Sequence, residues 1–87
     1  MNNGQGIKLI NATYLNEYNI ELRFSDNTVR QINFEIFLKT HSHPQFDKYK
    51  KLNNFRKFKI ERGNIVWGKN WDLIFDLWEL YDGINPV

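Results

Sequence analysis

The chain has 87 residues, 41% of them hydrophobic and 16% aromatic, which is enough for one hydrophobic core and too little for a second. It contains no cysteine, and this excludes disulfide frameworks, thiolate metal sites and thiol nucleophiles. The formal net charge is +2, but residues 39–62 carry eight basic and two acidic side chains, whereas residues 71–83 carry four acidic side chains and no basic one.

The first six residues, MNNGQG, contain nothing to bury, so we expect a disordered leader over residues 1–6 and a single domain over residues 7–87. This segment lacks the basic and then apolar layout of a secretory signal. No apolar run in the chain approaches the roughly 18 residues of a membrane span. We therefore expect a cytoplasmic protein with no membrane contact.

Three strands are predicted next, in the order of an antiparallel meander. Ile, Leu, Thr and Tyr side chains fill much of residues 7–15, and apolar and polar residues alternate over residues 20–24. The turn sequence SDN follows at residues 25–27, and the period of two resumes over residues 28–34.

The next segment predicts short helical pieces. Residues 35–40 (EIFLKT) suit one or two helical turns, and Pro44 ends them because it disfavours helical geometry at the residue before it. Residues 45–54 place three apolar side chains three positions apart, which predicts a short helical or irregular crossover.

A second hairpin is predicted after this crossover. Residues 55–60 alternate again, and an Arg-Gly pair at residues 62–63 leads into the apolar residues 65–67. Because Phe58 and Ile60 fall in phase, the intervening lysines are expected on a solvated face.

The last segment predicts an amphipathic helix that closes onto the sheet. Asp72 is a favourable N-cap, Gly83 suits a left-handed residue at the helix end, and Pro86 cannot extend the helix. The apolar positions at i, i+3, i+4 and i+7 are Ile74, Leu77, Trp78 and Tyr81. The expected fold class is therefore α+β: a small, mostly antiparallel sheet, made of a three-stranded meander and a second hairpin, packed against short helices.

Residues 7–82 together resemble the small bacterial family known as domain of unknown function 2442. The matching features are the strand Ile20 to Phe24 with Asp26, Phe55 to Ile60, Gly63, Ile65 to Trp67, and Asp72 with Leu73. The family usually shows Trp-Pro-Asn-Gly-Ala-Asp where this chain has Trp67, then GKNW, then Asp72. The resemblance implies a compact α+β fold, no established enzyme activity, and a partner-binding role, because relatives are often encoded beside another small protein in an arrangement like a toxin-antitoxin pair.

No residue pattern predicts catalysis. The glycines lack the spacing of a phosphate-binding loop, and neither serine lies in a nucleophile elbow. Asp72 and Asp76 are interpreted as helix charges, not as a catalytic pair. His41 and His43 are interpreted as exposed loop residues, because a zinc site needs three or four well-placed ligands. We expect no enzyme activity, no cofactor and no metal.

The leading hypothesis is a non-enzymatic protein-interaction module, the antitoxin-like member of a small two-gene pair, whose partner is a toxin-like product of the adjacent gene. Aromatic side chains are enriched at binding hot spots, and acidic ones could mimic phosphates in the basic cleft of a nucleic-acid enzyme. One of the two tryptophans beside the turn at residues 68–70 is expected to face inward. The candidate partner-binding residues are Trp67, Trp71, Asp76, Trp78, Glu79 and Asp82.

The alternative is a nucleic-acid-associated accessory protein. Residues 48–62 interleave seven basic side chains with three aromatic ones, a composition that can neutralise phosphates and stack bases. The candidate residues are Lys50, Lys51, Arg56, Lys57 and Lys59. A third hypothesis is a homodimer in which the basic face of one copy meets the acidic helix of the other.

Overall fold

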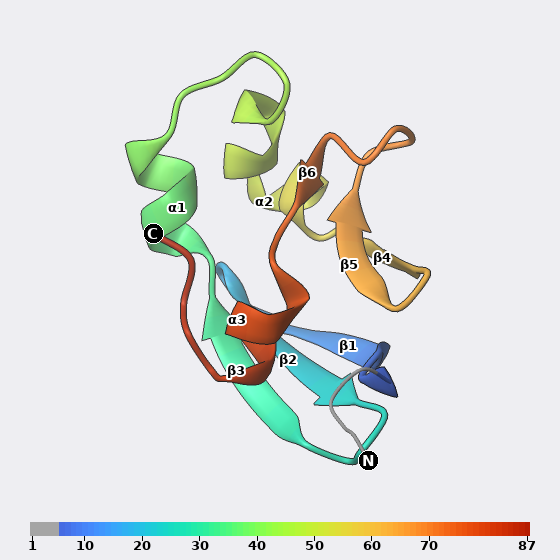
Figure 1. Ribbon diagram of the computed structural model, residues 1–87. Helices are drawn as coiled ribbons and strands as arrows, with labels where there is room; N and C mark the ends of the chain where they lie inside the picture. The colour runs from blue at the N-terminus through green and yellow to red at the C-terminus, as the bar shows by residue number, and fades with distance from the viewer. Residues whose placement is uncertain (1–5) are drawn as a thin grey trace.

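Two three-stranded antiparallel sheets form the framework of the protein in the computed structural model, which describes residues 6–87 (Figure 1). The first sheet, in the order β1-β2-β3, consists of β1 (Leu9–Asn16), β2 (Asn19–Phe24) and β3 (Val29–Asn33). The second, in the order β4-β5-β6, consists of β4 (Lys59–Glu61), β5 (Asn64–Trp67) and β6 (Leu73–Ile74). The α+β class is confirmed, and the predicted leader lies outside the described residues except for Gly6.

Four short helical segments lie within residues 7–87. They are α1 (Glu35–Thr40), the 3₁₀ helix η2 (Asp47–Lys50), α2 (Leu52–Phe55) and α3 (Leu77–Tyr81). The first three lie in the long connection from β3 to β4, where a short helix and a partly helical crossover were predicted (Figure 1). None of the helices among residues 6–87 has the length and hydrophobicity needed to cross a membrane.

The first sheet follows the predicted alternation of side chains. Ile20, Leu22 and Phe24 are fully buried, whereas Glu21 and Arg23 between them are exposed. Alternate residues of a strand point to opposite faces, so β2 covers the core with one face and meets solvent with the other. The register with β3 keeps this division, because Ile20 lies opposite the buried Ile32.

The core is built largely from rings around Trp67, whose side chain is 0% exposed. Its ring centroid lies 5.5 Å from those of Phe34 and Phe55, 5.8 Å from that of Phe75 and 6.1 Å from that of Phe58. The indole N–H donates to the Phe55 carbonyl at 2.7 Å, so the one polar atom of this buried ring is satisfied. Trp67 therefore joins the β3–β4 connection to the second sheet.

The predicted strand over residues 55–60 is shorter than expected, because Phe55 ends helix α2 and β4 begins only at Lys59. The Phe55 ring is fully buried and packs against Trp67, and the helical turn places it there. Packing into the core thus outweighed the alternating pattern at this position.

The predicted N-cap at Asp72 is wrong: helix α3 begins at Leu77, and the side chain of Asp76 caps it by accepting the backbone N–H of Trp78 at 3.1 Å. The residues after Asp72 form strand β6, in which Leu73 lies opposite Trp67. Their backbone groups pair with β5, and this pairing satisfies N–H and C=O groups that a helix start would leave open.

The shorter helix also changes the predicted apolar stripe. Leu80 is 1% exposed, and Leu77 and Tyr81 are half-buried, but Ile74 and Trp78 are 41% and 45% exposed. A helix of five residues has only one apolar flank, so the predicted i, i+7 spacing does not correspond to a single face.

The C-terminal segment covers the outer edge of β3. The Arg30 Nε donates to the Tyr81 carbonyl at 2.8 Å, and the Asn33 backbone N–H donates to the Asn85 Oδ1 at 3.0 Å. Pro86 is buried, and the end of the chain lies beside α1 (Figure 1). Edge strands offer open backbone groups, and this contact covers one of them, the N–H of Asn33.

Candidate functional site

The second sheet and the β3–β4 connection border a hollow of about 320 Å³, open to solvent, that we call the lysine hollow. Its lining residues are Lys48, Tyr49, Asn54, Lys57, Lys59, Gly68 and Lys69. They come from five places: helix η2, helix α2, the segment after α2, strand β4, and the turn between β5 and β6. The volume is within the range of small-ligand pockets, roughly 300–1,000 Å³.

The lysine hollow carries excess positive charge. The Lys48 Nζ lies 3.7 Å from the Asp72 Oδ2, and the Lys59 Nζ lies 3.1 Å from the Glu61 Oε2. Within residues 6–87, the other two lysines of the hollow have no ion-pair partner. Two carboxylates therefore balance four ammonium groups, and a concave surface of one sign concentrates counter-ions.

The wall of this hollow at Gly68 is closely packed. Gly68 has φ of +89°, and a Cβ atom there would lie 2.5 Å from the Asp72 Oδ2 and 2.8 Å from the Tyr49 hydroxyl. That hydroxyl donates to the Asp72 Oδ2 at 3.5 Å, and the Tyr49 side chain is 4% exposed. The turn thus needs glycine for both its backbone angle and its space.

A second hollow, of about 430 Å³, is shallow and wide open to solvent; it lies on the same sheet and is called here the indole hollow. Glu61, Arg62, Asn70 and Trp71 line it. The Trp71 Nε1–H donates to the Glu61 Oε1, and this hydrogen bond, followed by the one from Lys59, lowers the pKa of the Glu61 carboxyl below its usual range. Glu61 therefore stays ionised and holds the indole in one orientation.

The structure brings together only two of the five basic residues proposed for nucleic acid. Lys57 and Lys59 line the lysine hollow, whereas Arg56 lies 4.9 Å over the Tyr14 ring and Lys51 is exposed outside both hollows. Lys50 pairs with Asp47 at 3.3 Å.

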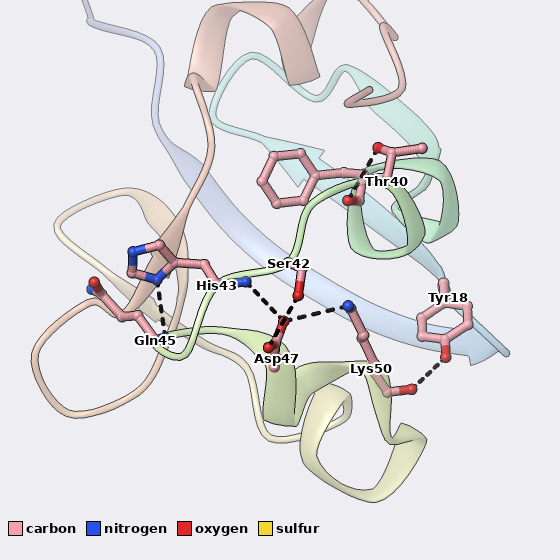
Figure 2. A network of polar contacts seen from close by, with 8 residues as sticks. Tyr18, Thr40, Ser42, His43, Gln45, Asp47 and Lys50 are labelled. Atoms are coloured by element: carbon pink, nitrogen blue, oxygen red, sulfur yellow. Dashed lines mark hydrogen bonds and ion pairs between the residues drawn. The ribbon is translucent and has the colours of Figure 1, made fainter.

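The Lys50–Asp47 pair belongs to a polar network that shapes the connection between α1 and η2. Figure 2 shows Asp47 between His43, Ser42 and Lys50, with the His43 backbone N–H donating to its carboxylate at 2.9 Å. That bond is the main reason why the pKa of Asp47 is lowered. The carbonyl of Lys50 also accepts the Tyr18 hydroxyl, so this lysine supports the loop.

The hollows contain basic and polar residues that the sequence reasoning did not single out. Lys48, Asn54 and Lys69 join the lysine hollow, and Asn70 and Arg62 join the indole hollow. One feature of the sequence could have indicated some of these residues: the short Gly-Lys-Asn turn lies between two tryptophans, and a turn at the end of a sheet exposes its polar side chains.

The six residues proposed for partner binding are divided by the structure. Trp67 is a core residue and cannot reach a partner, and the carboxylate of Asp76 is engaged as an N-cap. Trp71 is half-buried in the turn between β5 and β6, and this turn lies away from α3 (Figure 1). The remaining three, Trp78, Glu79 and Asp82, lie together on or beside α3 and are exposed.

The two loop histidines are held by their aromatic neighbours. The His41 ring stacks on Phe37 with centroids 4.3 Å apart, and the His43 ring stacks on Phe46 at 5.3 Å. The His43 Nδ1 accepts the backbone N–H of Gln45 (Figure 2). Among residues 6–87, no three His, Cys, Asp or Glu side chains are grouped closely enough to hold a metal ion.

The sequence profile of the family described as "Protein of unknown function (DUF2442)" matches residues 9–86. Comparison with curated proteins and with solved structures returned no significant match. The matched range runs from the start of β1 to the buried Pro86, so it contains both sheets, all four helical segments and both hollows. The chain therefore belongs to the DUF2442 family.

Proposed function

We propose that the protein is a non-enzymatic protein-interaction module, the antitoxin-like member of a small bacterial two-gene pair. The observation that carries the proposal is the 45% exposure of the Trp78 side chain on α3, beside the exposed carboxylates of Glu79 and Asp82. A tryptophan on the surface is costly to leave in water and is among the residues most often found at binding hot spots.

The surface around Trp78 is suited to a basic partner. Within residues 6–87, neither Glu79 nor Asp82 has a basic side chain within ion-pair distance. The Trp78 ring packs edge-on against Tyr81 with centroids 5.5 Å apart, so it is positioned before binding. Complementary charge increases the association rate, and a held ring loses less entropy on binding.

Co-expression with the product of the adjacent gene, followed by pull-down and titration, tests this proposal. Trp78→Ala should weaken the complex about 30-fold, the effect of losing about 2 kcal/mol at a hot spot. The matched control is Ile36→Ala, because Ile36 is 53% exposed on another helix and should leave affinity unchanged. Failure of the two products to co-purify, or equal losses in both variants, would contradict the proposal.

A second candidate function is a nucleic-acid-associated accessory protein. It is supported by the lysine hollow, in which two of the five proposed basic residues meet two further lysines around one concave surface. Neutralisation of phosphates by lysines supplies most of the sequence-independent affinity for nucleic acids. This surface is separate from Trp78, so the two functions can be tested independently.

A further inference from the structure

We propose that the lysine hollow and the indole hollow together bind one nucleotide unit, with its phosphate among the lysines and its base against Trp71. The ligand chemistry is an anionic phosphate next to a flat heterocycle, supplied either by a free nucleotide or by a single-stranded nucleic acid. The inference deepens the second candidate function, on which it rests, because it names the site and the contacts.

The two hollows share their walls. Strand β4 gives Lys59 to one and Glu61 to the other, and residues two apart on a strand point to the same face. The turn after β5 gives Gly68 and Lys69 to the lysine hollow, and its next two residues to the indole hollow. Glu61 contacts both sides, because it pairs with Lys59 and accepts the Trp71 indole N–H.

The lysine hollow is suited to a phosphate and not to a base. Lys57 and Lys69 have no ion-pair partner within residues 6–87, whereas the Asn54 amide is already engaged, because its Nδ2 donates to the Lys48 carbonyl at 3.0 Å. The one ring in the lining, that of Tyr49, is 4% exposed and cannot stack on a ligand. The hollow therefore offers donors and charge without an aromatic face.

The indole hollow supplies the aromatic face. The Trp71 N–H is occupied by Glu61, which leaves the ring for stacking, and Asn70 and Arg62 bring an amide and a guanidinium to the same hollow. Trp71 has φ of +56°, a conformation that bulky residues rarely adopt. Asn or Gly would adopt this backbone conformation at a lower cost. Backbone strain of this kind is found preferentially at binding and active sites.

Backbone and indole ¹H–¹⁵N NMR spectra of the whole protein test the proposal with defined probes. These are adenosine, inorganic phosphate, adenosine monophosphate, and single-stranded hexamers of adenylate and deoxyadenylate. We expect the monophosphate and the hexamers to shift signals of residues 57–61 and the Trp71 indole, but not the Trp78 indole. Adenosine and phosphate alone should bind more weakly than the monophosphate, because each fills one hollow.

The hexamers identify the source of the nucleotide. The site is assigned to a single strand if a hexamer binds at least about tenfold more tightly than the monophosphate. In that case a plot of the logarithm of the binding constant against the logarithm of the salt concentration should have a slope of about −0.7 for each phosphate contacted. Equal affinities assign it to a free nucleotide.

Charge reversal and ring removal test the two halves of the site. The double variant Lys57→Glu/Lys69→Glu should lose at least about tenfold in affinity for the monophosphate. Lys51→Glu makes one such charge reversal outside both hollows and should keep the affinity for the monophosphate, whereas Lys57→Glu alone should lower it. Trp71→Asn should lose about fivefold to a hundredfold, the effect of one lost stack, and Trp71→Phe should recover part of it.

Trp71→Asn also separates binding from folding. Asn tolerates the left-handed backbone, and this gain offsets part of the lost Trp71–Glu61 hydrogen bond, so the variant should remain folded at the temperature of the titration while it loses the ligand. The proposal is overturned by no shifts with any probe at low ionic strength, by inorganic phosphate binding as tightly as the monophosphate, or by shifts confined to α3. If a hexamer binds through Lys51 alone, the second candidate function stands but the nucleotide site proposed here is excluded.

Discussion

Gly68 determines whether the turn from β5 into β6 can form. Two independent restraints act on this residue, its φ of +89° and the carboxylate and hydroxyl that fill the space of a side chain. Gly83 has the first restraint only, because its φ is +80° but a Cβ there would meet nothing closer than 3.4 Å. A comparison of substitutions at Gly68 and Gly83 therefore distinguishes the cost of backbone strain from the cost of crowding.

Alanine substitution at the two glycines should have unequal effects. Gly83→Ala should lower the free energy of unfolding by roughly 1–2 kcal/mol through its left-handed backbone. Gly68→Ala should lower it by about 1–3 kcal/mol more, because Asp72 and Tyr49 must also move. Urea denaturation of both variants measures the difference, and equal losses would show that crowding at Gly68 is relieved without cost.

The three tryptophans show which single-residue properties can be predicted from sequence. Composition and spacing predicted that one of Trp67 and Trp71 would be buried, and the structure buries Trp67. The choice between them depends on the rings of Phe34 and Phe55, which lie 33 and 12 residues before Trp67 in the chain. Long-range contacts of this kind leave no local signal.

At the scale of elements, the C-terminal helix depends on Asp76. Its side chain accepts a backbone N–H from the first turn, and its charge lies at the positive end of the helix dipole. Asp82 is at the opposite end of α3, where the dipole does not favour a negative charge.

Removal of the cap should destabilise the fold measurably. Asp76→Ala should lower the free energy of unfolding by about 1 kcal/mol. Asp82→Ala, the control at the other end of the helix, should change it by less than about 0.5 kcal/mol. Chemical denaturation gives both values, and a loss at Asp82 as large as that at Asp76 would contradict the assignment of the cap.

Elements set by a local pattern were predictable, and those set by partners were not. The alternation over β2 and the helical turns of α1 are encoded in consecutive residues. Asp72 was predicted as an N-cap because apolar residues with helical spacing follow it. Leu73 and Ile74 pair with the edge of β5 instead. The same limit applies to the lysine hollow, whose lysines come from η2, β4 and two turns.

At the scale of the whole molecule, three carboxylates accept hydrogen bonds that hold the fold together, one within a loop and two between different elements. Asp26 accepts the Tyr81 hydroxyl from α3, Asp47 accepts the backbone of His43, and Glu61 accepts the Trp71 indole. Those hydrogen bonds are the main cause of the lowered pKa of each carboxyl. Ionised carboxylates thus favour the folded state.

Stability should therefore fall in acid. A carboxyl with a lowered folded pKa contributes its full stabilisation above its ordinary pKa, about 4, and loses it as the pH falls through the folded value. From this cause, the thermal midpoint should change little between pH 7 and about pH 5. It should decrease once the pH falls below about 4. In Tyr81→Phe the pKa of Asp26 returns toward its ordinary value, so this variant should lose less on acidification. A parallel decline in both proteins would exclude Asp26 as a contributor.

The contact between β3 and the last residues also determines how copies of the chain behave toward one another. Arg30 and Asn33 direct their hydrogen bonds to Tyr81 and Asn85, so a cut between these two residues would remove the cover from Asn33. The uncovered strand would present an edge that matches its own counterpart on a second molecule, the arrangement from which cross-β fibrils grow. Residues 82–87 thus cover the Asn33 end of this edge, and we expect a chain cleaved after Asp82 to self-associate more than the intact chain, which light scattering would measure.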